Sequence, residues 1–386
     1  MKASINRQDK YFVLRMSSLM FLILFLTNIF RVLKERLIVV FIGIESLCYI
    51  RIILLLPLAL LVIYLLAALR KRYSPQRIFN LVLWFYIVFI AVFICVLYPY
   101  IEAFKLPTRW QEVVLHTLPT ANRWMPLFTF WPITLLYLLA ELWPVLICSN
   151  CFWELSNRRV ITKEAAQAYP LYNLVGQSSI LLTGLVLYLS NFSVKHATVV
   201  WGLDHVQCLG ATASILMLGV SVLYNRITKQ YAQLAMSQPH QSSNIKKLTW
   251  IQTLRLLYND RHVANIFICT LIYYAVISIV QTLWLYNLSV YCTTPSLIAT
   301  YQAKTLVMVG LSTLSFALMS SVLLSRLGWY VVLQILPFTV FIFSTGVWIG
   351  YTHAHLPWWS YTTRYLSTCL NVLVKSMKYA FFDTTR

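Results

Sequence analysis

The sequence is poor in charged residues and in glycine. Only 11% of its 386 residues are Asp, Glu, Lys or Arg, against roughly 25% in an ordinary soluble domain, and only 10 are glycine. Hydrophobic residues make up 60%, and the mean hydropathy is +0.71. A soluble chain of this length has too little interior to bury so much apolar surface. The composition therefore excludes a soluble enzyme, a nucleic-acid-binding module and a disordered chain.

Patterns for metal binding and catalysis are also scarce. Cys148 and Cys151 have C-x-x-C spacing, but they end a hydrophobic run with no second pair, so we interpret them as helix-packing residues. His353 and His355 are the one close histidine pair, and no cysteine or acidic residue stands beside them. No nucleophile and base occur together in a recognisable pattern. We therefore expect neither an enzyme nor a metal or other cofactor.

Long apolar runs dominate what is present. About 20 helical residues cross roughly 30 Å of hydrocarbon. Apolar runs suited to this length lie at residues 16–30, 50–69, 78–98, 127–149, 171–192, 199–224, 263–289, 297–325, 328–350 and 360–380. The first run follows basic residues, as a signal peptide does, but no small-residue cleavage site comes after it, so we interpret it as a retained helix. The predicted fold is an all-α polytopic membrane protein of about ten transmembrane helices.

The longest polar stretch, at residues 225–262, divides these helices into two blocks. It predicts an N-terminal half of six helices at 1–224, a basic cytoplasmic linker at 225–262, and a partial C-terminal half of four helices at 263–386. This six-plus-four order resembles the two-half plan of a major-facilitator-like helical bundle. That plan has six helices in each half, so the second block is shorter than expected.

Basic residues outnumber acidic ones by 31 to 11, which gives a net charge of +20. Most of the Lys and Arg residues fall in alternate loops, so the positive-inside rule places both termini in the cytoplasm. The excess is then mostly topological, and its partner is the lipid bilayer rather than nucleic acid. Since no targeting peptide precedes the first helix, we expect a bacterial inner membrane.

Polar side chains inside the apolar runs are candidate functional residues, because an ionisable group near the bilayer centre is costly. Arg31 and Lys34 are three residues apart and share a helical face, although both could extend to the membrane surface. Glu141 lies in mid-helix between apolar residues. Its side chain is shorter than that of lysine or arginine, so it reaches the membrane surface less easily. Gln281 could bind solute or a neighbouring helix, and we expect Lys304 to reach the surface.

These charges together suit an anionic solute. Arg31 and Lys34 on one wall of a cavity would take phosphate or carboxylate charge. Glu141 on another wall would pair with a basic residue in the empty state, or couple to a proton. We therefore expect Lys34 and Glu141 to face a central cavity of the first six-helix half. Charge placement does not name the solute.

At these positions the chain resembles the ATP/ADP translocase family of intracellular bacteria and plastids, the non-mitochondrial nucleotide transporters. Arg31-Val-Leu-Lys34-Glu35-Arg36-Leu is similar to R-D-T-K-D-T-L of that family. Further similarities run along the chain in Ala140-Glu141-Leu-Trp143, Phe152-Trp153-Glu-Leu-Ser-Asn157, Ile161-Thr162-Lys163-Glu-Ala-Ala166, Tyr169-Pro-Leu-Tyr172 and Asn371-Val-Leu-Val-Lys375-Ser-Met-Lys378-Tyr-Ala-Phe-Phe-Asp383.

The resemblance implies a nucleotide antiporter that exchanges ATP for ADP, or a relative that moves another nucleotide. It also implies that Lys34 and Glu141 are important for transport, and it adds Lys375 and Lys378 to the candidate substrate-binding residues. With these, the candidate set is Arg31, Lys34, Glu141, Gln281, Lys375 and Lys378.

Several positions depart from the family pattern. Gln281 stands where the family has glutamate, Leu285 where it has lysine, and Asn173 and Val175 where it has glycine. Family members also continue past the F-D motif into two further helices. Two interpretations stay open: a divergent transporter, or a truncated or decayed paralogue that inserts but transports weakly or not at all. A membrane enzyme is a distant third.

The charge pattern and the family resemblance together predict that Lys34→Ala reduces nucleotide uptake at least tenfold. The lost charge-assisted contact to phosphate is worth roughly 1.5–3 kcal/mol. Uptake of labelled nucleotide by intact bacteria that express the chain measures the effect. Unchanged uptake in this variant would refute the assignment of Lys34.

Overall fold

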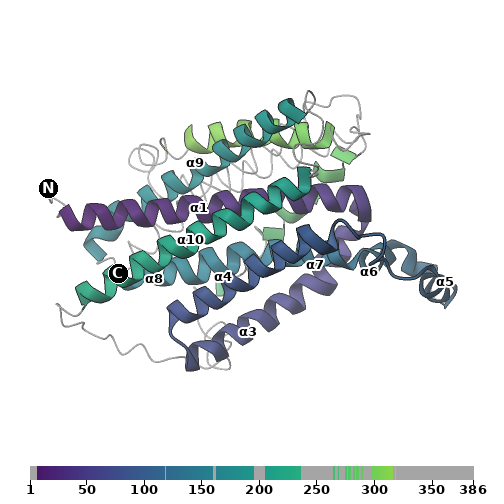
Figure 1. Ribbon diagram of the computed structural model, residues 1–386, viewed down its shortest axis with the longest axis horizontal. Helices are drawn as coiled ribbons and strands as arrows, with labels where there is room; N and C mark the ends of the chain where they lie inside the picture. Colours follow the sequence, from purple (N-terminus) through teal and green to yellow (C-terminus); the bar gives the residue numbers. More distant parts are fainter. Residues whose placement is uncertain are drawn as a thin grey trace.

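The computed structural model describes residues 7–117, 119–159, 162–194, 205–235 and 297–315, together with Leu318 and part of the segment 264–289. The described chain folds into long helices that run roughly along one axis (Figure 1). The principal helices are α1 (Arg7–Leu37), α3 (Leu56–Arg72), α4 (Pro75–Val92), α7 (Trp131–Trp143), α9 (Thr162–Val194) and α10 (His205–Ala235). Shorter helices are α2 (Leu47–Tyr49), α5 (Thr108–Thr117), α6 (Met125–Thr129) and α8 (Trp153–Arg159).

Seven helical segments among the described residues are long and apolar enough to cross a membrane. They are Tyr11–Ile42, Ile44–Arg72, Pro75–Leu97, Trp131–Asn157, Ala168–Ser190, His205–Gln230 and Leu297–Ser315. They confirm an all-α, multi-pass membrane fold and correspond to the first six predicted runs and the eighth. The predicted run 263–289 is represented by the shorter apolar helix Ile277–Tyr286. The runs 328–350 and 360–380 lie outside the described residues.

The first segment is longer than the apolar run at 16–30. That run stops at the first charged residue, whereas α1 continues as a helix through Arg31 and Lys34 to Leu37 and then into a π-helical turn at Ile38–Ile42. Gly43 has a positive φ of 87°, a left-handed conformation that side-chain-bearing residues rarely adopt, and it turns the chain sharply into the next segment. The charged end of α1 is thus part of the same continuous helix as the apolar run.

Proline and small polar residues set the helix boundaries. Ser74 caps α4, accepting a hydrogen bond from the backbone N–H of Arg77. Pro144 ends the regular part of the fourth segment, because proline lacks the N–H that an α-helix needs, and nine residues from Pro144 to Phe152 continue as π-helical turns. Cys148 and Cys151 lie buried in these turns, and Cys148 contacts Met20 of α1. Among the described residues no group of His, Cys, Asp or Glu could hold a metal ion.

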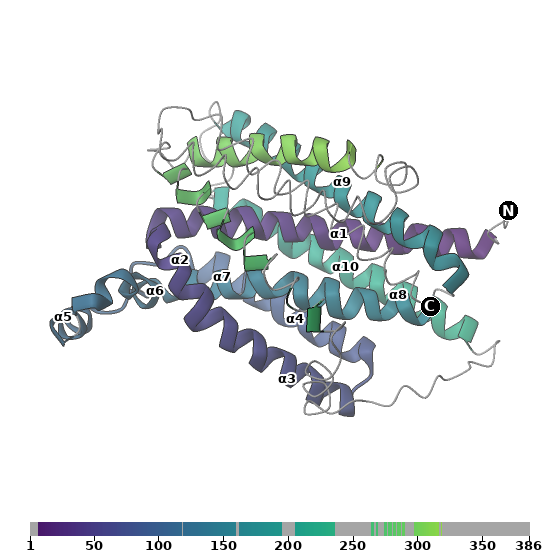
Figure 2. The same cartoon turned by 180° about the vertical axis from the view of Figure 1, so that it is seen from behind.

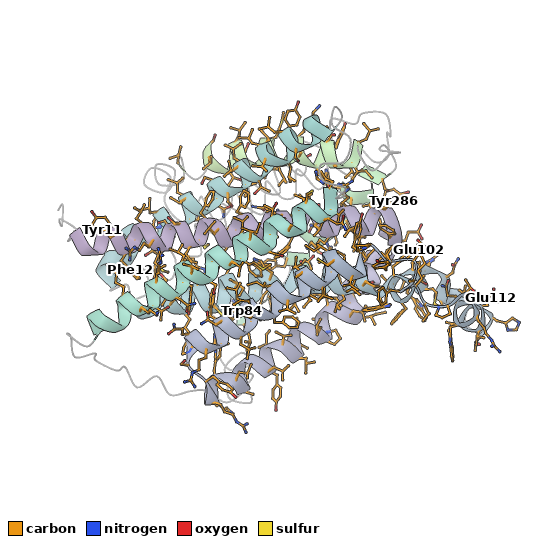
Figure 3. The ribbon with its side chains drawn as sticks, in the orientation of Figure 1. Tyr11, Phe12, Trp84, Glu102, Glu112 and Tyr286 are labelled. Atoms are coloured by element: carbon orange, nitrogen blue, oxygen red, sulfur yellow. The ribbon has the colours of Figure 1, made fainter. Side chains whose placement is uncertain are left out.

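Helix α1 lies at the centre of the bundle. It packs against α9, α10 and α7 (Figures 1 and 2). Its inward side chains are almost fully buried, and they include Met16, Leu19, Ile23, Leu26 and Phe30. In contrast, α3 and much of α4 present large apolar side chains outward, as at Trp84, where lipid would cover them (Figure 3). The exposed α5, with Glu112, projects beyond the end of the bundle at which α1 finishes.

Two of the few glycines lie where α9 meets the helix of residues 297–315. A Cβ atom on Gly184 would lie 2.6 Å from the backbone nitrogen of Val307, and one on Gly310 would lie 2.5 Å from Cα of Leu181. Real Cβ atoms do not approach backbone so closely, so these glycines let the two helices cross in direct backbone contact. The crossing joins the first six segments to a later one.

We expect Gly184→Ala and Gly310→Ala each to destabilise the protein by about 1–3 kcal/mol, because the added methyl group overpacks a backbone contact. The melting temperature of the purified protein should fall by several degrees. Gly219→Ala is the matched control, since its Cβ would meet nothing within 4 Å. Equal melting temperatures for all three variants would contradict the crossing.

Candidate functional site

Lys34 and Glu141 form an ion pair inside the bundle. Lys34 Nζ of α1 lies 2.5 Å from Glu141 Oε1 of α7. The lysine side chain is 6% exposed and the glutamate side chain 25%. Lys34 therefore does not extend to the membrane surface. The structure brings together two residues that are far apart in the sequence.

Tyr137 lies next to this ion pair and contacts Lys34. It lies one helical turn before Glu141 on α7, so both side chains share a face. Lys34 Nζ sits 5.0 Å from the centre of the Tyr137 ring, within the range of a cation–π contact. The rings of Phe30 and Trp143 meet edge to face nearby, at 5.3 Å between centroids, and both are fully buried. The aromatic packing holds α1 and α7 in the register that the ion pair requires.

Arg51 connects Tyr137 to a later helix. Its Nε donates to the Tyr137 hydroxyl at 3.1 Å. The rest of the guanidinium donates to the carbonyl and hydroxyl oxygens of Ser278, at 2.9 and 2.5 Å, and to the hydroxyl oxygen of Thr282 at 2.9 Å. A longer contact of 3.5 Å reaches Oε1 of Gln281. One arginine thus joins the first segments to the helix of residues 277–286.

Glu35 makes a second connection between the same parts of the chain. Its two carboxylate oxygens accept from Nε2 of Gln281 at 2.9 Å and from Nε2 of Gln302 at 3.4 Å. Glu35 and Gln302 are both buried. Gln281 therefore lies between a cation and an anion, accepting from Arg51 and donating to Glu35. An amide can do both, whereas a carboxylate at this position would repel Glu35.

The remaining candidates lie differently. Arg31 is half-buried, one turn before Lys34, close enough for the two positive charges to interact. Within the described part of the chain it forms no hydrogen bond or ion pair. Lys304 is exposed. Lys375, Lys378, His353 and His355 lie outside the described residues.

The cluster carries one more positive charge than negative. Arg31, Lys34 and Arg51 are cationic, and Glu35 and Glu141 are anionic. Charges removed from water must be paired or hydrogen-bonded to persist. The contacts above meet that need for Lys34, Glu141, Arg51 and Glu35. A cluster with a cationic excess inside an apolar bundle favours an anionic solute.

Arg51 and Glu35 were not singled out from the sequence. Arg51 could have been found, because eighteen consecutive residues without charge follow it, at 52–69. Glu35 is adjacent to Lys34, but residues one apart on a helix point in different directions, so its partners could not be inferred. Tyr137 and Gln302 carry no charge and resemble ordinary residues of a membrane helix.

A bundle of membrane-spanning helices around a buried charged cluster is typical of polytopic membrane transporters. The particular family follows from comparison with known proteins. This chain belongs to the TLC ATP/ADP transporter family, whose model matches residues 4–386.

Individual relatives align with nearly the whole chain. It is 26% identical to ADP,ATP carrier protein 4 of Rickettsia prowazekii over 401 aligned residues, which cover 99% of this chain and 78% of that protein. It is 22% identical to ADP,ATP carrier protein 3 of Rickettsia bellii over 412 residues, covering 99% of this chain and 81% of the relative. No solved structure matches.

The ion pair predicts strong coupling between Lys34 and Glu141. Lys34→Met or Glu141→Leu alone leaves a charge without its partner in the bundle, a change that costs up to about 3–5 kcal/mol when the charge is fully buried. The double variant removes both charges, so its melting temperature should be higher than that of either single variant. Thermal unfolding of the purified proteins measures this.

Arg70→Met is the control for that experiment. Arg70 pairs with Glu154 at 3.0 Å, but its side chain is 40% exposed, so its loss should cost under about 1 kcal/mol. Additive effects of the two single substitutions would contradict the coupling.

Proposed function

We propose that this protein exchanges nucleotides, ATP for ADP or closely related species, across a bacterial inner membrane. The observation that carries the proposal is the match over residues 4–386 to a family of ATP/ADP transporters. Relatives named ADP,ATP carrier proteins align with nearly the whole chain. The cationic excess around Lys34 supports an anionic substrate independently of these names.

In this proposal Arg31 and Lys34 bind phosphate oxygens. Lys34 is paired with Glu141 at 2.5 Å, so this pair would give the buried ammonium a counter-ion between transport steps. An incoming phosphate replaces that counter-ion, and Glu141 then takes other donors or a proton. The family resemblance adds Lys375 and Lys378 as further phosphate-binding candidates. No bond in the substrate is made or broken, so the protein acts as a carrier and not as an enzyme.

We further propose a major-facilitator-like arrangement, with one half at 1–224, a linker at 225–262 and a second half at 263–386. The bonds of Arg51 and Glu35 to residues 278–302 would then bridge the two halves. With both termini cytoplasmic, as the basic loops favour, the cluster lies toward the outer surface. The bridged arrangement would be one in which that side is closed.

Gln281 is one of several departures from the family pattern that keep open the alternative of a paralogue that inserts without transporting. The geometry weakens the part of that argument that rests on Gln281, because glutamine satisfies Arg51 and Glu35 at once. The site retains an ordered set of hydrogen bonds without a glutamate at this position. The substitution therefore supports altered substrate or coupling rather than loss of function.

The test is exchange by purified protein in proteoliposomes. Vesicles loaded with ADP should accumulate labelled ATP, and vesicles without internal nucleotide should not. Lys304→Ala should exchange as the unsubstituted protein does, because its side chain is exposed and outside the cluster. Exchange that is absent with every nucleotide pair, in protein shown to be inserted and folded, would overturn the proposal.

A further inference from the structure

Arg51 differs from the other cations of the cluster in its partners. Lys34 has the carboxylate of Glu141, whereas Arg51 donates to a tyrosine hydroxyl, a serine, a threonine and an amide oxygen, all of them neutral. Among the described residues no carboxylate forms an ion pair with it. Glu141 and Glu35 act on it only through longer-range attraction. Its Nε and Nη1 groups have acceptors, but its charge is not neutralised by contact.

We propose that Arg51 binds a negatively charged group of the transported solute. This inference rests on the proposed transport function and adds a binding residue to it. A guanidinium remains ionised under all ordinary conditions, and inside a membrane segment its charge needs a counter-ion. Its planar set of donors matches the oxygens of a phosphate or carboxylate, which it can bind through two parallel hydrogen bonds. The solute supplies the counter-ion that the protein does not.

Arg51 lies beside the first cation of the site. Both Arg51 and Lys34 contact Tyr137, one at its hydroxyl at 3.1 Å and the other over its ring at 5.0 Å. The two positive groups are therefore separated by about one tyrosine side chain. A chain of linked phosphates can contact both at once, whereas a single small anion would contact one. This arrangement favours a solute with several adjacent negative charges.

Anion binding at Arg51 competes with the 277–286 helix. The oxygens of Ser278 and Thr282 occupy the same N–H donors that an anion would take. When the anion binds, Arg51 gives up some of these bonds, and the helix loses one of its two polar connections to the first segments. Gln281 keeps the other, through Glu35. Solute binding is thereby coupled to the contact between the two parts of the chain.

The experiment compares the full-length purified protein with Arg51→Gln, Arg51→Lys and the control Arg70→Gln. The probes are ATP, ADP, inorganic triphosphate and uncharged adenosine, and the readout is the rise in melting temperature with probe concentration. Arg51→Gln should weaken apparent affinity for the three anions at least tenfold. Arg51→Lys, which keeps the charge but not the planar donors, should lose less. Arg70→Gln should match the unsubstituted protein.

A second variant separates substrate binding from a purely structural role. The double substitution Ser278→Ala/Thr282→Ala removes the two competing hydroxyl acceptors while it keeps Arg51. It should bind triphosphate and ATP more tightly than the unsubstituted protein, because two acceptors that compete for Arg51 are gone. A bridging role without anion binding predicts no gain, and it predicts unchanged affinity in any folded Arg51 variant. Should Arg51→Gln fail to fold, Arg51→Lys and this double variant carry the test.

The outcomes for the two proposals are distinct. Binding of inorganic triphosphate but of no nucleotide, with loss in the Arg51 variants, supports Arg51 as an anion site and overturns nucleotide exchange. Nucleotide binding that is equal in folded Arg51→Gln and the unsubstituted protein overturns the role of Arg51 and leaves nucleotide exchange standing. Absence of binding by every anion in the unsubstituted protein overturns both.

Discussion

The centre of this protein is organised by one requirement: ionised side chains inside an apolar helical bundle must be paired or hydrogen-bonded. The Lys34–Glu141 ion pair meets that requirement between α1 and α7, the helices at the core of the described bundle. Tyr137 extends the pair to Arg51. Because α1 also packs against α9 and α10, the position of Lys34 depends on the whole arrangement. Of these charged side chains, the cations Lys34 and Arg51 are the ones that an anionic solute can bind.

Two different contacts join the early helices to the later ones. At Gly184 and Gly310 the helices cross with no space for a side chain, so the contact is fixed by van der Waals packing. At Arg51 and Glu35 the contact consists of hydrogen bonds to hydroxyl and amide groups. Such bonds can be exchanged for bonds to a solute at little net cost, whereas a tight apolar crossing cannot. The exchangeable contact lies beside the ion pair, where binding of a solute would act on it.

Gln281 illustrates how a substitution within a family is accommodated. Where the family pattern has a carboxylate, this chain has an amide that accepts from Arg51 and donates to Glu35. Glutamine in place of glutamate at this position removes one negative charge from the cluster and leaves a cationic excess. It also leaves Arg51 without a contacting counter-ion among the described residues. The same substitution thus preserves the hydrogen bonding and changes the electrostatics.

Hydropathy and charge in the sequence determined the membrane class and the positions of the first six spans and the eighth. They also identified Lys34 and Glu141 as charges in apolar surroundings. These follow from local physical chemistry, because the cost of burying a charge and the length needed to cross a bilayer can be read along one segment. Only the tertiary structure decided that Lys34 pairs with Glu141 at 2.5 Å and that Arg51 and Glu35 belong to the same cluster. Partners on different helices depend on how those helices are rotated and packed, and no spacing within one helix encodes that.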